Sequence, residues 1–432
     1  MKAPETNPAK RFLVTYTDGT ISRQEASDIL SVDSAAVQNA ETLMATDAIL
    51  TANDVVYFDH MGISSLVLTD EQAQALQNHP GVLAVEEDRE MFALEAMLIE
   101  DYDKAVATAY QSGYTSAMFE VFQKLVAPPA TGNGQAVGSA LPGSSPLATQ
   151  PIPWNINQVK APGAWAKGYR GAGVKVAVLD TGVAAHADLV IAGGVSFVPG
   201  VASYNDGHGH GTHCCGVVGA RNNAVGVVGV APECALYAVK VLSDAGSGAT
   251  SSIIAGMTWA KNNGMKVVSM SLGALSGPSV AYATAISQLN AAGVTVVCAA
   301  GNSYQSAFPW VNSPANSAGA VAVGAIDSAS AIASFSSRGA QPGSTGWNPV
   351  TVVGPGVNVY STYKGNTYTT MSGTSMATPH VAGAAVLIKQ RYPAYTPAQV
   401  KTLLQKTATD LGPAGRDLTY GAGLINCEKA VS

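Results

Sequence analysis

The stretch that decides the fold reads MSGTSMATPH from Met371 to His380 and continues as VAGAAVLI from Val381 to Ile388. Small and apolar residues fill this run on every side over more than two helical turns, which predicts a buried helix. Ser375 is expected at the N-terminal end of that helix, where unpaired N–H groups and the helix dipole favour developing negative charge. Two interpretations of Ser375 are therefore open, a nucleophile and an ordinary helix-capping serine.

The chain around this helix alternates between apolar strands and helical stretches from Pro151 onward. Helices are expected over residues 251–262 and 279–291. The expected strands are Val174–Leu179, Ala235–Val241, Val267–Leu272 and Val294–Ala300. Such alternation predicts an α/β fold with a mostly parallel sheet between two layers of helices. Ligands of these sheets bind outside the carboxyl ends of the strands.

The composition is that of a densely packed protein. The 432 residues are 47% hydrophobic and 12% charged, about half the usual charged share. No apolar run reaches the roughly 18 residues that span a bilayer, and residues 1–7 lack the apolar core of a signal peptide. A cytoplasmic protein and a secreted one whose signal was removed both remain open. The five cysteines show no CxxC spacing, so we expect buried thiols.

The first third of the chain has a different character. Residues 1–150 carry 20 Asp and Glu against 7 Lys and Arg, whereas residues 151–432 carry 9 against 16, so the two parts are expected to attract each other. Residues 10–91 read as a small α+β unit, with a capped helix after Thr69. Its expected strands are Arg11–Tyr16, Asp54–Phe58, Ser65–Leu68 and Val82–Asp88. Residues 92–126 have helical spacing, and residues 127–149 form a linker rich in Pro, Gly and Ser.

Three polar residues stand out in the α/β part. Asp180 directly follows the first expected strand, and Asn302 ends the run after the last one. His210 lies in the segment DGHGHGTH, together with His208 and His213. A zinc site is disfavoured because the spacing lacks the HExxH pattern, so His210 is interpreted as a general base. Taken singly, Asp180 and Asn302 are equally typical of plain turn residues.

Together these residues resemble one family. Asp180, His210 and Ser375 follow each other in the order Asp, His, Ser, which is the order of the subtilisins. The local sequences VLDTG, HGTH and GTSMA agree with it. From Gln150 to the C-terminus the chain resembles the subtilisin-like serine proteases, or subtilases, which implies a subtilisin-like three-layer fold.

The resemblance implies a role for each residue. Ser375 would attack the scissile carbonyl, His210 would carry the proton and Asp180 would orient the imidazole. Asn302 would form the oxyanion hole together with the Ser375 backbone N–H. The segment Ser271, Leu272, Gly273 resembles the family's substrate-binding strand, which pairs with an extended peptide. His208 and His213 would then be structural.

The resemblance also implies a structural Ca²⁺ ion. Its side-chain ligands would be Gln150, Asp188 and Asn223. Its carbonyl ligands would be Arg221, Val225 and Val227. Calcium prefers such mixed oxygen ligands, whereas the alternative interpretation is a plain Asn turn. No organic cofactor is expected.

Residues 10–94 resemble the inhibitory propeptide of subtilases. The resemblance implies a ferredoxin-like α+β domain for this part of the chain. By that resemblance Leu94 occupies the first cleavage position. Gln150 lies 56 residues later, so residues 95–149 are an added segment of helices and linker before a catalytic domain at 150–432. We expect a second cleavage within 140–149; retention of this segment after a single cut is the alternative.

The leading hypothesis is a serine endopeptidase made as a zymogen that removes its own propeptide. A non-catalytic relative that binds peptides or regulates a protease is the alternative. An esterase is disfavoured because no G-x-S-x-G elbow surrounds Ser375. The expected partners are protein or peptide substrates and the chain's own propeptide, with no nucleic acid and no membrane. We expect a monomer, secreted by analogy with the family.

Overall fold

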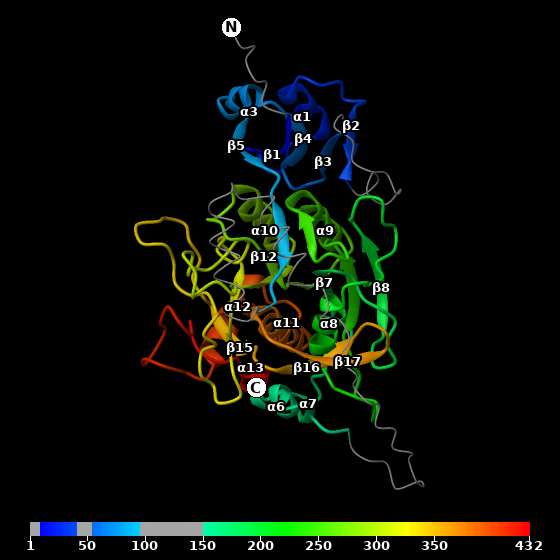
Figure 1. Ribbon diagram of the computed structural model, residues 1–432, viewed down its shortest axis with the longest axis vertical. Helices are drawn as coiled ribbons and strands as arrows, with labels where there is room; N and C mark the ends of the chain where they lie inside the picture. Colours follow the sequence, from blue (N-terminus) through cyan, green and yellow to red (C-terminus); the bar gives the residue numbers. More distant parts are fainter. Residues whose placement is uncertain (1–8, 41–53, 96–149) are drawn as a thin grey trace, which may run out of the picture.

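The computed structural model describes residues 9–40, 54–95 and 150–432 (Figure 1). The helices expected within 95–126 and the linker at 127–149 lie outside these residues. An N-terminal unit (residues 9–95) packs on one side of a larger C-terminal unit (residues 150–432). No helix in the described part of the chain is long and apolar enough to cross a bilayer.

A seven-stranded sheet forms the centre of the C-terminal unit, in the order β15-β14-β13-β11-β7-β9-β8. Neighbouring strands pair in parallel throughout, which confirms the expected α/β architecture. The strands are β7 (Lys175–Asp180), β8 (Ile191–Ser196), β9 (Ala235–Lys240), β11 (Val267–Met270), β13 (Thr295–Ala299), β14 (Val321–Ile326) and β15 (Val352–Pro355).

Helices cover both faces of this sheet. On one face α8 (His210–Gly219) packs against α11 (Thr374–Arg391), and on the other α9 (Thr250–Asn262) packs against α10 (Val280–Ala291). Every residue of α11 from Thr374 to Lys389 is buried, as the uniformly small and apolar sequence predicts. The remaining helices are α6 (Trp154–Gln158), α7 (Ala161–Ala166), α12 (Pro397–Thr407) and α13 (Cys427–Ala430).

Two pairs of short strands lie outside the main sheet. The antiparallel hairpin of β16 (Val359–Tyr363) and β17 (Thr367–Met371) leads into α11. The strands β10 (Ser247–Ala249) and β12 (Leu272–Gly273) flank a third strand that comes from the N-terminal unit. The expected strand Val267–Leu272 is therefore divided, because residues 272–273 leave the parallel sheet and pair with that strand instead.

The N-terminal unit is an α+β domain with a mixed sheet in the order β2-β3-β4-β1-β5. Capping boxes at Ser22 and Thr69 start the helices α1 and α3. Its elements are β1 (Lys10–Tyr16), α1 (Arg23–Leu30), β2 (Val37–Asn39), β3 (Val55–Phe58), β4 (Ile63–Leu68), α3 (Asp70–Gln77) and β5 (Val82–Glu87). The sheet packs against α9 and α10.

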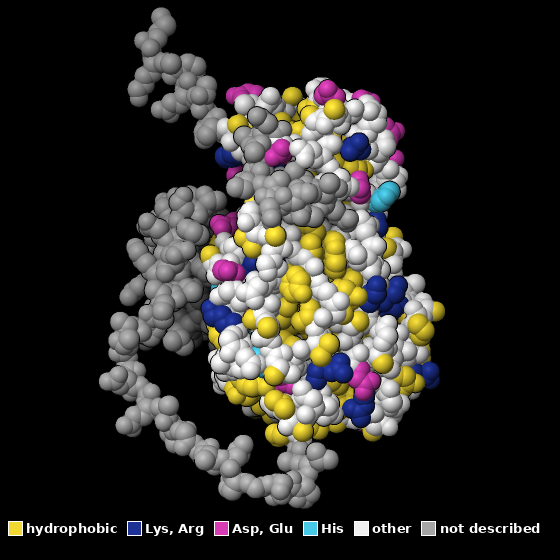
Figure 2. Space-filling model, turned by 90° about the vertical axis from the view of Figure 1, so that its right-hand side faces the viewer, with side chains coloured by type: hydrophobic (Ala, Val, Ile, Leu, Met, Phe, Trp, Pro, Cys, Tyr) yellow, Lys and Arg dark blue, Asp and Glu magenta, His cyan; other side chains and the backbone are white. Residues whose placement is uncertain are grey.

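Acidic side chains of the N-terminal unit meet the N-terminal ends of α9 and α10. The Glu86 carboxylate accepts hydrogen bonds from the backbone N–H groups of Val280 (3.2 Å) and Ala281 (2.7 Å). The Asp88 carboxylate accepts one from the Ser251 N–H at 2.9 Å, and burial raises the pKa of Asp88. Figure 2 shows further acidic side chains on the N-terminal unit and mainly Lys and Arg on the same face of the C-terminal unit. The acidic first third thus contacts helix N-termini, where negative charge is stabilised.

The last strand of the N-terminal unit, β6 (Glu90–Ala93), extends away from its domain and over the C-terminal unit (cyan in Figure 1). It pairs antiparallel with β10 on one side and with β12 on the other. Sequence analysis placed residues 92 and 93 in a helical stretch, and this prediction was wrong. Both edges of the segment are engaged by strands more than 150 residues away in the chain, a contact that local periodicity does not reveal.

Candidate active site

The carboxylate and the imidazole expected at the site are in direct contact. Asp180 ends β7 and His210 begins α8, and Oδ1 of Asp180 lies 2.7 Å from Nδ1 of His210. Both side chains are fully buried. The Thr181 N–H donates to the same Oδ1 at 2.7 Å. The carboxylate therefore fixes the ring, and Nε2 is left as the nitrogen that can exchange a proton.

The buried pair changes the proton affinity of the imidazole. Burial alone would lower the pKa of His210, but the adjacent Asp180 carboxylate outweighs it and raises the pKa above its ordinary value. An imidazole of this kind holds a transferred proton more firmly than a free one.

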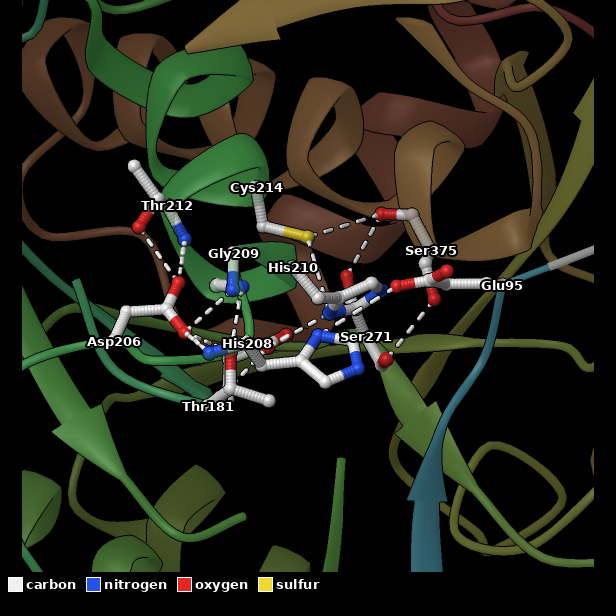
Figure 3. A network of polar contacts seen from close by, with 12 residues as sticks. Glu95, Thr181, Asp206, His208, Gly209, His210, Thr212, Cys214, Ser271 and Ser375 are labelled. Atoms are coloured by element: carbon white, nitrogen blue, oxygen red, sulfur yellow. Dashed lines mark hydrogen bonds and ion pairs between the residues drawn. The ribbon is translucent and has the colours of Figure 1, made fainter. Parts of the chain in front are cut away.

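Ser375 lies in the first turn of α11, beside this pair (Figure 3). Its hydroxyl donates to the Ser271 carbonyl oxygen at 3.0 Å, and the Ser271 hydroxyl donates back to the Ser375 carbonyl oxygen at 2.8 Å. Within the described residues Nε2 of His210 has no hydrogen-bond partner. The structure thus brings all three residues into one cluster, with the Ser375 hydroxyl directed at Ser271 and not at His210.

Asn302 presents its amide N–H group to the neighbouring strand. Its Oδ1 accepts hydrogen bonds from the Thr374 backbone N–H and hydroxyl, both at 2.9 Å. Because a backbone N–H can only donate, these bonds fix which end of the amide is oxygen. Nδ2 then donates to the carbonyl oxygen of Leu94 at 2.7 Å. Asn302 is held in the place and orientation that an oxyanion donor requires.

Residues 90–94 occupy the cleft as an extended peptide. Ala93 pairs with Leu272, and Phe92 pairs with Gly273 and, on the other side, with Ser247. The Leu94 N–H donates to the Ser271 carbonyl oxygen at 3.2 Å. These contacts place the Leu94 carbonyl at Asn302, with Glu95 as the next residue of the chain.

The side chains of Asp206 and Lys240 support the site, and neither was recognised in the sequence. Asp206 accepts hydrogen bonds from the Thr212 N–H and hydroxyl (2.9 and 2.6 Å) and from the Thr181 hydroxyl (2.9 Å). The buried ammonium of Lys240 donates to the Thr181 carbonyl oxygen and, at 2.7 Å, to Asp244. The position of Asp206, four residues before His210, was the one available signal.

The other two histidines differ in their surroundings. His213 is buried, its Nε2 faces the Val359 carbonyl oxygen at 3.0 Å, and burial lowers its pKa to about 3. His213 therefore stays neutral inside the core. His208 lies next to His210, with ring centroids 6.3 Å apart.

A thiol also contacts the site. Sγ of Cys214 lies 3.6 Å from the Ser375 carbonyl oxygen and 4.0 Å from Nδ1 of His210. Among the His, Cys, Asp and Glu side chains of the described residues, Asp180, His210 and Cys214 are the one group of three or more that lies close enough together to hold a metal ion. Burial raises the pKa of Cys214, and a protonated thiol is a poor metal ligand. The cluster is therefore better suited to proton transfer than to metal binding.

The residues expected to hold calcium converge at a second place. The Gln150 amide contacts the carbonyl oxygens of Val225 and Val227, and its Oε1 accepts from the Asn223 N–H at 2.9 Å. In this arrangement the side-chain N–H group of Gln150 lies between the carbonyl oxygens of Val225 and Val227.

Asp188 completes this second cluster. Its Oδ2 accepts from the Val227 N–H at 2.8 Å, and its backbone carbonyl accepts from the Arg221 N–H at 2.9 Å. Its Oδ1 is buried and has no hydrogen-bond partner within the described residues. An orphaned carboxylate oxygen beside two carbonyl oxygens fits a hard cation such as Ca²⁺.

Comparison with known proteins agrees with the fold. The model of the subtilase family matches residues 171–423. The chain is 51% identical over 281 residues to subtilisin Savinase of Lederbergia lenta, which covers 65% of this chain and 99% of that protein. It is 51% identical over 281 residues to an alkaline protease of Alkalihalobacillus alcalophilus, and the match covers 70% of that protein. It is 50% identical over 283 residues to subtilisin DY of Bacillus licheniformis, and the match covers 99% of that protein.

The fold and the site define a serine protease of the α/β type. The chain belongs to the subtilase family and is a subtilisin-type serine endopeptidase with an additional N-terminal region.

The contact between Asn302 and Leu94 predicts the effect of removing the amide. For Asn302→Ala we expect kcat to fall about 100- to 1,000-fold, the magnitude known for this donor in subtilisin itself, with little change in KM. Asn290→Ala, which removes an amide bound only to the Gly319 carbonyl, serves as the control and should keep full activity. Steady-state kinetics on a chromogenic peptide measure both; a loss confined to KM would contradict the assignment.

The Asp180–His210 contact predicts the pH dependence. Activity requires neutral His210, so kcat/KM should rise with pH and reach half its plateau above pH 6.5, the ordinary imidazole value. Asp180→Asn removes the charge that raises the pKa, so this midpoint should move to lower pH while the plateau drops about 10,000-fold. A pH–rate profile of both proteins provides the measurement, and an unchanged midpoint in Asp180→Asn would be inconsistent with this account.

Proposed function

We propose that Ser375, His210, Asp180 and Asn302 carry out the peptide-bond hydrolysis of this endopeptidase. The observation that carries the proposal is the placement of the Leu94 carbonyl. Asn302 holds its oxygen, and the Leu94 N–H and the Ser375 hydroxyl both donate to the Ser271 carbonyl oxygen. A carbonyl in that position is ready for attack by a neighbouring hydroxyl.

The chemistry follows from the atoms available. The Ser375 hydroxyl turns from Ser271 toward Nε2 of His210, gives up its proton there and attacks the carbonyl carbon. Negative charge on the carbonyl oxygen is stabilised by Nδ2 of Asn302 and by the Ser375 backbone N–H at the start of α11. The C–N bond then breaks, the leaving amine takes the proton from His210, and water hydrolyses the acyl-enzyme by the same steps.

Substrates are bound through their backbone. An extended peptide replaces β6 between β10 and β12, and Ser271, Leu272 and Gly273 supply one of the two edges. Main-chain hydrogen bonds of this kind accept many sequences. The Leu94 side chain lies over Gly273, where a Cβ atom would come within 2.9 Å of it. An apolar side chain before the cut is therefore suited to this site.

Residues 10–94 act as an inhibitory propeptide and residues 150–432 as the catalytic domain. The support is steric: β6 fills both edges of the cleft, and Glu86 and Asp88 anchor the unit on α10 and α9. A substrate cannot enter until this strand leaves. Cleavage of the Leu94–Glu95 bond comes first, and a second cut within 140–149 then removes residues 95–149.

The second cluster binds a structural Ca²⁺ ion. The ligands are the side chains of Gln150, Asp188 and Asn223 and the carbonyl oxygens of Arg221, Val225 and Val227. The orphaned Oδ1 of Asp188 supports this assignment. A cation there would join the start of the catalytic domain to the loop after α8 and thereby stabilise the folded state.

A fluorophosphonate probe tests the catalytic assignment. The matured wild-type protein should be labelled at Ser375, because only an activated hydroxyl reacts. Ser375→Ala should show no label and should accumulate as the uncut 432-residue chain. Ser372→Ala, three residues away, is the control and should behave as wild type. Lack of labelling in the matured wild type would favour the non-catalytic alternative, and normal processing of Ser375→Ala would disprove autocatalysis.

Chelation tests the calcium assignment. In the uncut Ser375→Ala chain, Ca²⁺ at a hundredfold excess over its Kd should add about 2.7 kcal/mol of stability, a rise in melting temperature of roughly 5 °C. EDTA should abolish the rise. Asp188→Asn should melt at the same temperature with and without Ca²⁺, whereas the exposed Asp410→Asn should respond like the parent. A calcium response that survives in Asp188→Asn would refute the site.

A further inference from the structure

After the Leu94 carbonyl held at Asn302, the last residue that the structure describes in this part of the chain is Glu95. Because the Leu94 carbonyl oxygen is bound by Asn302, Glu95 is the first residue after the bond to be cut. Oε1 of Glu95 lies 3.8 Å from Nδ1 of His208, and Figure 3 shows the two side chains on the same side of the catalytic residues. His208 is therefore the residue of the C-terminal unit that meets the new N-terminus.

The backbone around His208 is held firmly at this place. The backbone N–H groups of His208 and Gly209 both donate to Oδ1 of Asp206, at 3.0 and 2.7 Å. The Tyr363 hydroxyl donates to the His208 carbonyl oxygen at 3.1 Å. Gly209 has φ of 109°, a conformation that favours glycine. The loop thus fixes the backbone position from which the His208 side chain extends.

The ring also has an unfilled hydrogen-bonding position. The His208 side chain is only 9% exposed, and its Nδ1 has no hydrogen-bond partner among the described residues. An unpaired polar atom in such surroundings is costly, and a suitable group on a substrate relieves the cost. In this structure the nearest such group belongs to Glu95.

Several charged groups surround the ring and set its protonation. Burial and the neighbouring His210 lower the pKa of His208, whereas Glu95, Asp180 and Asp206 raise it, and the net direction is downward. Three other groups face this loop. Asp244 accepts a hydrogen bond from the Gly207 N–H, and the Lys364 ammonium donates one to the Gly207 carbonyl oxygen. The third is the Tyr363 hydroxyl. The pKa of His208 therefore lies below its ordinary value, and the ring is neutral at pH 7.

We propose that His208 is a specificity residue of this protease that recognises the side chain immediately after the cut and favours an acidic one. This inference rests on the proposed endopeptidase function. The preference for a carboxylate over the uncharged amide of the same shape strengthens as the pH falls, because the imidazole gains a positive charge while a glutamate side chain remains ionised down to about pH 4.3.

The test compares two peptides that span residues 88–99, one with the natural sequence and one with Glu95→Gln. The matured enzyme and its His208→Gln variant are assayed from pH 5 to pH 8, and cutting at the bond after Leu94 is followed by mass spectrometry. The readout is the ratio of kcat/KM for the two peptides. Titration of His210 affects both peptides equally and cancels in this ratio. A Glu90→Gln peptide, changed away from His208, is the control.

For the wild type we expect the ratio to favour the natural peptide and to rise about three- to fivefold from pH 8 to pH 5, the range of a partly exposed ion pair. In His208→Gln the ratio should stay near one at every pH. The same rise in the variant, or a flat ratio in the wild type, would overturn the proposal. If the wild type cuts neither peptide, the endopeptidase function fails and this inference fails with it.

The full-length chain provides a second measurement in case His208→Gln does not mature. There, Glu95→Gln in the otherwise wild-type protein should slow the first cut more at pH 5 than at pH 8. Equal slowing at both pH values would overturn the role of His208.

Discussion

The N-terminus of α11 is the feature on which the rest of the site depends. This helix is buried from Thr374 to Lys389, so its first N–H groups are cut off from water and need acceptors within the protein. Oδ1 of Asn302 satisfies the Thr374 N–H and in doing so turns its own Nδ2 into the cleft. The next N–H group, that of Ser375, is left for the oxyanion. One local requirement of helix ends thus positions both oxyanion donors and the nucleophile.

The parallel sheet provides the remaining parts because its strands end at the same edge. Asp180 ends β7, and the segments after β11 and β13 carry Ser271 and Asn302. The site is therefore rigid before substrate arrives, which is the property that electrostatic stabilisation of a transition state requires. Near the site, β10 and β12 each present a strand edge, and in this structure β6 pairs with both of them. Inhibition and substrate binding use the same backbone hydrogen bonds.

Sequence reasoning reached the core of the fold and singled out the residues that we propose as catalytic, because both have local signals. The central strands are continuous apolar runs, and Asp180, His210 and Ser375 lie in short motifs of recognisable order. It missed β14, a similar apolar run, because no polar residue of interest follows it, and β8, whose IAGGVS sequence has a weak strand signal. The contacts of Glu86, Asp88 and His208 were also missed. Each depends on segments that meet only after folding, and neither periodicity nor composition records such contacts.

The central claim is that the chain presents its own Leu94–Glu95 bond to its active site. The most direct test is intact-mass analysis of the full-length protein sampled during maturation, in the Asn302→Ala background to slow the first cut. The account predicts that the first two products are residues 1–94 and 95–432, with Glu95 as the new N-terminus, and that any cut within 140–149 appears later. A first cut within 140–149, with the Leu94–Glu95 bond still intact, would contradict it.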